Sequence, residues 1–244
     1  MTTLFTRRKA LPTIAAGAAA GTLGFARGGE KQVVGMQLIL AADTSLSVLE
    51  NRYDMQMDGY LEAFQSGRLF GAIQNLEPPS LAVLFVLWGS YPQILIPWSV
   101  LSGKASLLEF CGRFAAQSAS RPRAGAYTRI DYLMKFCRTQ FDIEFVSQRR
   151  VLDVSGDGGN SYAPISHKGL RQEKELLIAQ GVTINGLPIL VVPPDTISPE
   201  QPPEGLDMYY RNHVVGGPGA FVIPSQGFEG FRNAILAKLV AEVA

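Results

Sequence analysis

The chain has 244 residues, of which 47% are hydrophobic and 18% are charged, and its formal net charge is +1. This length accommodates one sizeable α/β domain, and the apolar content is sufficient for a full core, which argues against a disordered chain. Because the charge is balanced and the body of the chain contains no block of Lys and Arg, the composition also argues against nucleic-acid binding.

The N-terminus predicts an export signal over residues 1–26. Basic residues at positions 7–9 precede a mildly apolar stretch rich in Ala and Gly, with no acidic residue before Glu30. The stretch is too short and too weakly apolar for a transmembrane helix, and small residues suit cleavage after Ala26. The paired arginines resemble a twin-arginine leader, and Sec export is the alternative route. We therefore expect a periplasmic or secreted protein without a stable membrane span; a cytoplasmic protein with an N-terminal arm is the alternative.

The first half of the remaining chain predicts a strand-helix-strand unit followed by an edge strand. An apolar run over 33–42 predicts a central strand, and apolar residues at three- and four-residue spacing predict a helix over 49–67. The continuous apolar run over 81–88 predicts a strand buried on both faces. Residues 93–100 contain Pro97, which favours an edge strand that pairs back as a hairpin.

The second half continues the alternation of helices and strands. Helices are predicted over 106–116, 129–141 and 168–180, and strands over 150–155 and 182–192. An exposed Pro-rich loop is predicted over 193–203. It is followed by a short helix over 204–211, an edge strand over 220–223 and a closing helix over 228–243. This order predicts a single domain over 27–244 with an α/β fold. Its mainly parallel central sheet is doubly wound, with one antiparallel edge hairpin and helices on both faces.

A few other polar residues could carry chemistry. Cys111 and Cys137 lie in predicted helices, and although an oxidising compartment would allow a bond between them, we expect two buried free thiols. His167 and His213 are too isolated in the sequence to be expected as ligands. Asp153 is expected to face a neighbouring loop. The alternative is that it hydrogen-bonds to a metal ligand without contacting the ion itself.

Two predicted strands end in short polar segments. Asp43-Thr44-Ser45-Leu46-Ser47 directly follows the first strand, and Ser155-Gly156-Asp157-Gly158 ends the strand that begins at residue 150. Open α/β sheets bind ligands outside the carboxyl ends of their strands, and alternate residues of an extended loop point to one side. Carboxylates and hydroxyls are hard oxygen donors that suit Mg²⁺, with Ca²⁺ or Mn²⁺ as alternatives, whereas a set without Cys or His argues against zinc. An ion with so few protein charges would attract a further carboxylate from outside.

The Asp-x-Ser-x-Ser pattern after the first strand resembles the metal-ion-dependent adhesion site (MIDAS) of von Willebrand factor type A (VWA) domains. In that family a Thr from a later loop and an Asp from an Asp-Gly turn at a strand end complete the site. The matching residues here are Thr128 and Asp157, although the loop before Thr128 departs from the family's usual run of glycines. The resemblance covers nearly the whole mature chain. It implies a VWA/Rossmann-like fold and a metal site formed by Asp43, Ser45, Ser47, Thr128 and Asp157.

Further stretches, such as Pro97-Trp98 and Asn185-Gly186-Leu187-Pro188-Ile189, resemble a bacterial branch of these domains that is generally exported and has no assigned activity. The implied function is an exported, non-enzymatic binding module, in which Mg²⁺ bridges to an acidic residue of an envelope or secreted partner. One alternative is a hydrolase or phosphotransferase with Asp43 as nucleophile, although such phosphatases carry a second Asp where this chain has Ser45. The other is a passive envelope scaffold without metal. Helix capping by Asp43 and Ser45 alone would not explain Thr128 or Asp157.

Overall fold

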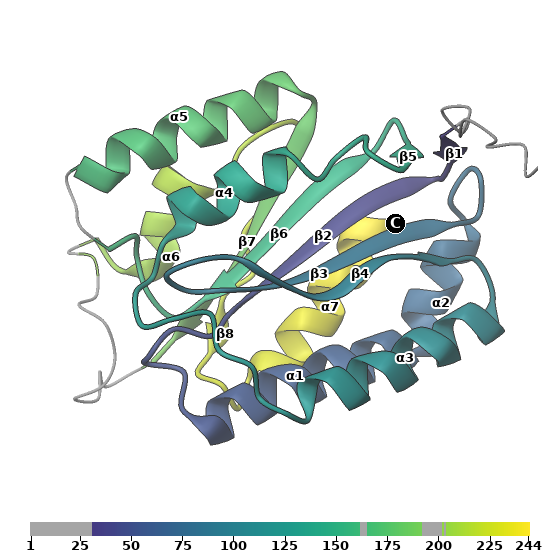
Figure 1. The fold of residues 1–244 in the computed structure, drawn as a ribbon, viewed down its shortest axis with the longest axis horizontal. Helices are drawn as coiled ribbons and strands as arrows, with labels where there is room; N and C mark the ends of the chain where they lie inside the picture. The colour runs from purple at the N-terminus through teal and green to yellow at the C-terminus, as the bar shows by residue number, and fades with distance from the viewer. Residues whose placement is uncertain (1–30, 162–164, 192–201, 203) are drawn as a thin grey trace, which may run out of the picture. The chain divides into compact units, whose positions relative to one another are not determined.

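A six-stranded sheet in the order β4-β3-β2-β6-β7-β8 forms the centre of the fold (Figure 1). Its strands are β2 (Met36–Asp43), β3 (Leu81–Trp88), β4 (Gln93–Leu101), β6 (Arg150–Gly156), β7 (Val182–Leu190) and β8 (Ser225–Gln226). All neighbouring strands are parallel except β3 and β4, which are antiparallel and place β4 at one edge. A separate parallel pair joins β1 (Gln32–Val33) to β5 (Phe145–Val146). The predicted mainly parallel sheet with one antiparallel edge hairpin is confirmed.

The computed structural model describes residues 31–161, 165–191, 202 and 204–244. Residues Lys31–Ala244 form one compact unit. The predicted leader over 1–26 and most of the predicted loop over 193–203 lie outside the described residues. No helix within the described ranges is both long enough and apolar enough to cross a membrane.

Helices cover both faces of the sheet because successive residues of the central strands enter two different cores. In β2, Leu38 and Leu40 lie in one core, whereas Ile39 and Ala41 lie in the other. The first core is completed by α1 (Glu50–Gln65), α2 (Gly67–Gln74), α3 (Lys104–Ser118) and α7 (Phe231–Val243), and the second by α4 (Ile130–Arg138), α5 (Ile165–Ala179) and α6 (Leu206–Tyr209). Figure 1 shows the two groups on opposite sides of the sheet. Burial on both faces explains why β2 and β3 are continuously apolar.

Local features differ from the sequence predictions where short-range contacts decide the structure. The helix predicted over 49–67 ends early, because Ser66 is extended and its hydroxyl accepts a hydrogen bond from the N–H of Arg68 (3.2 Å), which starts α2. No strand forms over 220–223, where Val222 makes only an isolated bridge to Gly186, and β8 provides the edge instead. The short helix predicted over 204–211 becomes α6 followed by a π-helical turn, η1 (Tyr210–Val214).

A buried ionic cluster joins α7 to the sheet. Asp153, Lys238 and Glu242 are all buried, and the Lys238 ammonium lies 2.7 Å from the Asp153 carboxylate and also contacts Glu242. Asn185 donates to the Glu242 carboxylate (2.9 Å). Burial, and then the charge of Asp153, raises the pKa of Glu242 to about 7. The prediction that Asp153 faces a neighbouring loop is therefore wrong, because the residue pairs with a helix more than 80 positions later in the chain.

The cysteines and histidines have well-defined surroundings. Cys111 and Cys137 are free and buried, as expected. Burial raises the pKa of the Cys137 thiol well above its ordinary value. His167 and His213, which are not expected to be ligands, stack with ring centroids 5.5 Å apart. The hydroxyl of Tyr209 lies 3.2 Å from Nε2 of His167, so these side chains form one cluster between α5, α6 and η1.

Candidate metal centre

The candidate metal centre lies where two adjacent central strands end. β2 ends at Asp43, and its neighbour β6 ends at Gly156, immediately before Asp157. After β2 the chain adds β3 and β4 towards one edge of the sheet. It later adds β6 and β7 on the opposite side of β2, towards the other edge. The point at which the strand order reverses lies between β2 and β6. In doubly wound sheets this is the position at which a crevice for ligands opens outside the carboxyl ends of the strands.

Hydrogen bonds connect four of the predicted ligands. The Ser47 hydroxyl donates to Oδ1 of Asp157 (2.8 Å), and the hydroxyls of Ser45 and Ser47 lie 3.3 Å apart. The backbone N–H of Ser45 donates to Oδ1 of Asp43 (2.8 Å). All four side chains are buried. The two polar segments that the sequence separates by more than 100 residues therefore meet at one point.

Gly156 allows the carboxylate of Asp43 to lie against the end of β6. A Cβ atom at position 156 would lie 2.9 Å from Oδ2 of Asp43, 2.9 Å from the Trp88 ring and 3.0 Å from the Tyr210 hydroxyl. A side chain here would therefore displace the carboxylate or the surrounding aromatic residues. The close approach explains why glycine precedes Asp157 at this strand end.

Thr128 reaches the same region through its backbone contacts. It lies just before α4 and is buried. Its N–H donates to the hydroxyl of Ser161 (3.1 Å), and its carbonyl accepts from the N–H of Ser161 (2.7 Å). The N–H of Leu46 donates to the carbonyl of Ala126 (3.1 Å). These bonds attach the loop of Thr128 both to the segment after Asp157 and to the turn that carries the two serines.

The electrostatics of the site are dominated by two carboxylates removed from water. Burial, and then the charge of Asp157, raises the pKa of Asp43 to about 8, although hydrogen bonds from Ser45 partly offset this rise. The pKa of the Tyr210 hydroxyl is also raised well above its ordinary value, by burial and then by the charge of Asp43. Negative charge is therefore unfavourable at this point of the metal-free protein. A cation would reverse this preference.

The donor set fits a small, hard divalent cation. Within the described residues, Oδ2 of Asp43 is buried and has no hydrogen-bond partner, which leaves a lone-pair donor available for an ion. Two carboxylates and three hydroxyls supply only oxygen, as Mg²⁺ prefers. No group of three or more His, Cys, Asp and Glu side chains suited to a metal occurs in the described part of the chain. The candidate site contains only two such side chains, Asp43 and Asp157, and is therefore compatible with this absence.

Three further residues shape the site without being among the predicted ligands. The hydroxyl of Thr44 donates to the carbonyl of Trp88 (3.3 Å) and accepts from the N–H of Ala124 (3.1 Å). Gln56 of α1 donates to the carbonyl of Asp43 (3.2 Å). Tyr210 packs its hydroxyl beside Gly156. Thr44 could have been found from its place inside the Asp-x-Ser-x-Ser segment, whereas no sequence pattern marks Gln56 or Tyr210.

Solved structures share this fold. A von Willebrand factor type A protein from Catenulispora acidiphila aligns at a TM-score of 0.57 and 12% identity over 87% of this chain and 43% of its own. The proximal thread matrix protein 1 of the mussel byssus, in a form with a zinc-occupied MIDAS motif, aligns at a TM-score of 0.56 and 14% identity over 88% and 49%. The conserved hypothetical protein BatB from Bacteroides thetaiotaomicron aligns at 0.53 and 14% over 85% and 98%. This chain thus spans less than half the length of the first two proteins.

The sheet order, the two helical layers and these structural matches define a VWA-like fold. The resemblance inferred from the sequence is confirmed at the level of the fold. Residues 33–244 match the family described as "Protein of unknown function (DUF1194)", and the chain belongs to that family. No curated protein matches the chain in sequence.

Proposed function

We propose that this protein is a metal-dependent protein-binding module. Asp43, Ser45, Ser47, Thr128 and Asp157 would hold one divalent cation, and that cation would bridge to a carboxylate of a partner protein. The observation that carries the proposal is the pair of buried carboxylates, Asp43 and Asp157, at the switch point of the sheet. Ser47 hydrogen-bonds to Asp157, Ser45 hydrogen-bonds to Asp43, and the two serine hydroxyls contact each other. A pair so costly to charge in the absence of a cation is typical of a functional site.

Mg²⁺ is the proposed ion, with Ca²⁺ or Mn²⁺ as alternatives. Hydroxyl groups are neutral ligands, so two carboxylates are the only protein charges that would offset the ion. An Asp or Glu side chain from outside is the natural ligand for a remaining coordination position, because it restores the charge balance. The residues would act by holding and orienting the ion, and no turnover is required of them.

The proposed setting is the periplasm or the extracellular space. The basic and apolar character of residues 1–26 supports export. Structures of similar fold include a mussel byssus matrix protein and a pilus adhesin from Lactobacillus rhamnosus GG, the latter at a TM-score of 0.60, 12% identity and 88% coverage of this chain. We propose an envelope or secreted protein as the partner.

A thermal unfolding experiment with Mg²⁺ tests the metal-binding part of the proposal. At a concentration a hundredfold above Kd, the ion should stabilise the folded protein by about 2.7 kcal/mol, which raises the melting temperature by about 5–10 °C for a domain of this size. Asp43→Asn should abolish the response and, at neutral pH, raise the melting temperature of the metal-free protein, because folding no longer requires a buried carboxyl group to take up a proton. The control Asp58→Asn changes an exposed carboxylate of α1 and should behave as wild type. An equal Mg²⁺ response in Asp43→Asn would refute the assignment.

A further inference from the structure

Three exposed apolar side chains from three different loops lie around the candidate metal centre. Leu46, Tyr91 and Tyr127 are 69%, 54% and 53% exposed. Leu46 separates the two buried serines of the turn after β2, and Tyr127 directly precedes the buried Thr128. The backbone that turns the proposed ligands inward thus turns the residues between them towards solvent. We call Leu46, Tyr91 and Tyr127 the apolar rim.

Hydrogen bonds connect the three loops of the apolar rim. The N–H of Leu46 donates to the carbonyl of Ala126, the residue before Tyr127 (3.1 Å). The N–H of Tyr91 donates to the carbonyl of Ala124 (3.1 Å), and the N–H of Tyr127 donates to the hydroxyl of the residue before Tyr91 (3.0 Å). The three side chains therefore project from adjacent stretches of backbone.

Two glycines pack these loops directly against each other. A Cβ atom at Gly89 would lie 2.9 Å from the carbonyl oxygens of Ala124 and Gly125. Gly125 has a φ of +95°, and a Cβ atom there would lie 2.6 Å from the side chain of Ser90. Because there is no space between these two loops, the backbone that carries Tyr91 and Tyr127 is held in a fixed arrangement. A fixed apolar surface binds a partner with less loss of conformational entropy than a mobile one does.

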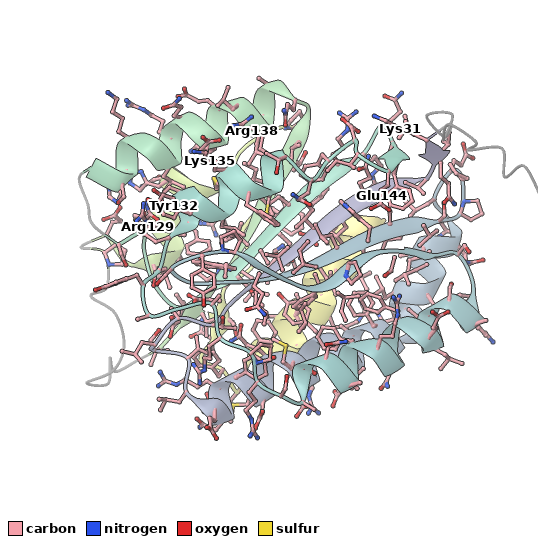
Figure 2. All side chains as sticks on the ribbon, viewed as in Figure 1. Lys31, Arg129, Tyr132, Lys135, Arg138 and Glu144 are labelled. Carbon is pink, nitrogen blue, oxygen red and sulfur yellow. The ribbon has the colours of Figure 1, made fainter. Side chains whose placement is uncertain are left out.

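Arg123 places a positive charge beside the apolar rim. Of the four arginines in residues 110–130, three form ion pairs with carboxylates: Arg113 with Glu109, Arg121 with Asp54 and Arg129 with Asp131. The guanidinium of Arg123 donates to the carbonyls of Ser45 (3.4 Å) and Val48, which brings a positive charge to the turn after β2. Arg129, just before α4, lies over the ring of Tyr132 at 3.6 Å from its centroid and pairs with Asp131. Figure 2 shows Lys135 and Arg138 farther along α4, where Arg138 pairs with Glu173. The charge of Arg123 complements an anionic partner.

The geometry points to the kind of segment that the site binds. Resting on the metal-dependent function proposed above, we infer that the partner presents an Asp or Glu with a large apolar residue within two positions of it. The carboxylate would reach the ion, and the neighbouring apolar side chain would be buried against the apolar rim. Burial of the partner's apolar side chain against the apolar rim would add affinity to the bond between its carboxylate and the ion. It would also distinguish this partner from other proteins that expose an Asp or Glu.

Selection from a random heptapeptide library in Mg²⁺ tests this inference. The expected enriched sequences contain Asp or Glu with Leu, Phe, Ile or Trp within two positions. The best selected peptide should bind Leu46→Ser and Tyr127→Ser about tenfold or more weakly than wild type. The control Leu108→Ser changes a leucine of α3 that is 71% exposed, and it should bind the peptide as wild type does. The Mg²⁺-induced rise in melting temperature should persist in all three variants.

Two sets of outcomes separate this inference from the proposed function. Enrichment of acidic residues flanked only by polar residues, no enrichment at all, or unchanged affinity in both rim variants would overturn the inference while the Mg²⁺ response of wild type stands. Absence of the Mg²⁺ response in wild type would instead refute the metal-dependent function and this inference with it.

Discussion

The absence of a side chain at Gly156 leaves room for the carboxylate of Asp43. In Gly156→Ala the new methyl group would lie 2.9 Å from that carboxylate and from the Trp88 ring, so we expect unfolding to require about 1–3 kcal/mol less free energy. Mg²⁺ should also stabilise this variant less than wild type, because the displaced carboxylate no longer faces the ion. The control Gly71→Ala lies in α2, where an added Cβ atom has no neighbour within 4 Å, and it should be slightly stabilising. Urea unfolding with and without Mg²⁺ measures both effects, and an unaltered Gly156→Ala protein would contradict the account.

The raised pKa of Asp43 gives metal binding a definite pH dependence. The pKa increases from 3.8 to about 8 on folding, so between these values the folded protein retains a proton that the unfolded chain releases. The contribution of this group to stability is therefore fully present below about pH 4 and is lost as pH rises through 8. Since the ion competes with that proton, Mg²⁺ affinity should increase by up to about tenfold per pH unit towards pH 8 and then level off. If titrations from pH 6 to 9 show a constant Mg²⁺ affinity, the ion does not compete with a proton on Asp43.

At the scale of elements, the buried Lys238 fixes α7 to β6. Lys238→Met would leave Asp153 and Glu242 buried without their cation, and we expect a loss of about 3–5 kcal/mol in the free energy of unfolding. The matched control on the same helix is Arg232→Met, which removes an exposed pair with Glu62 (2.9 Å) and should change stability by less than about 1 kcal/mol. Equal urea midpoints for the two variants would show that the cluster contributes nothing to the attachment of α7.

Elements defined by their own residues could be predicted, whereas those defined by distant partners could not. β2 and β3 are buried on both faces, so their continuous apolar runs identify them directly. β8 is two residues long and exists only because it pairs with Ile189 and Leu190, which no local pattern reports. In the candidate site, the spacing of Asp43, Ser45 and Ser47 carries a signal of its own. Tyr210 carries none, because folding alone brings it beside Gly156.

At the scale of the whole molecule, the proposed function requires export. Residues 1–26 fused to a reporter should carry it across the inner membrane, and replacing Arg7 and Arg8 by Lys should block passage if the twin-arginine route is used. Normal export of that double variant would assign the leader to the Sec route. If the unaltered fusion stays in the cytoplasm, the envelope setting is wrong.

The central claim is that one divalent cation binds where β2 and β6 end. Crystals of the protein grown with Mn²⁺, whose anomalous scattering locates the ion, test it most directly. The account predicts one strong peak at coordinating distance from Asp43, Ser45, Ser47, Thr128 and Asp157, or bridged to them by a water. The absence of any peak at saturating Mn²⁺, or a single peak elsewhere in the molecule, would contradict it.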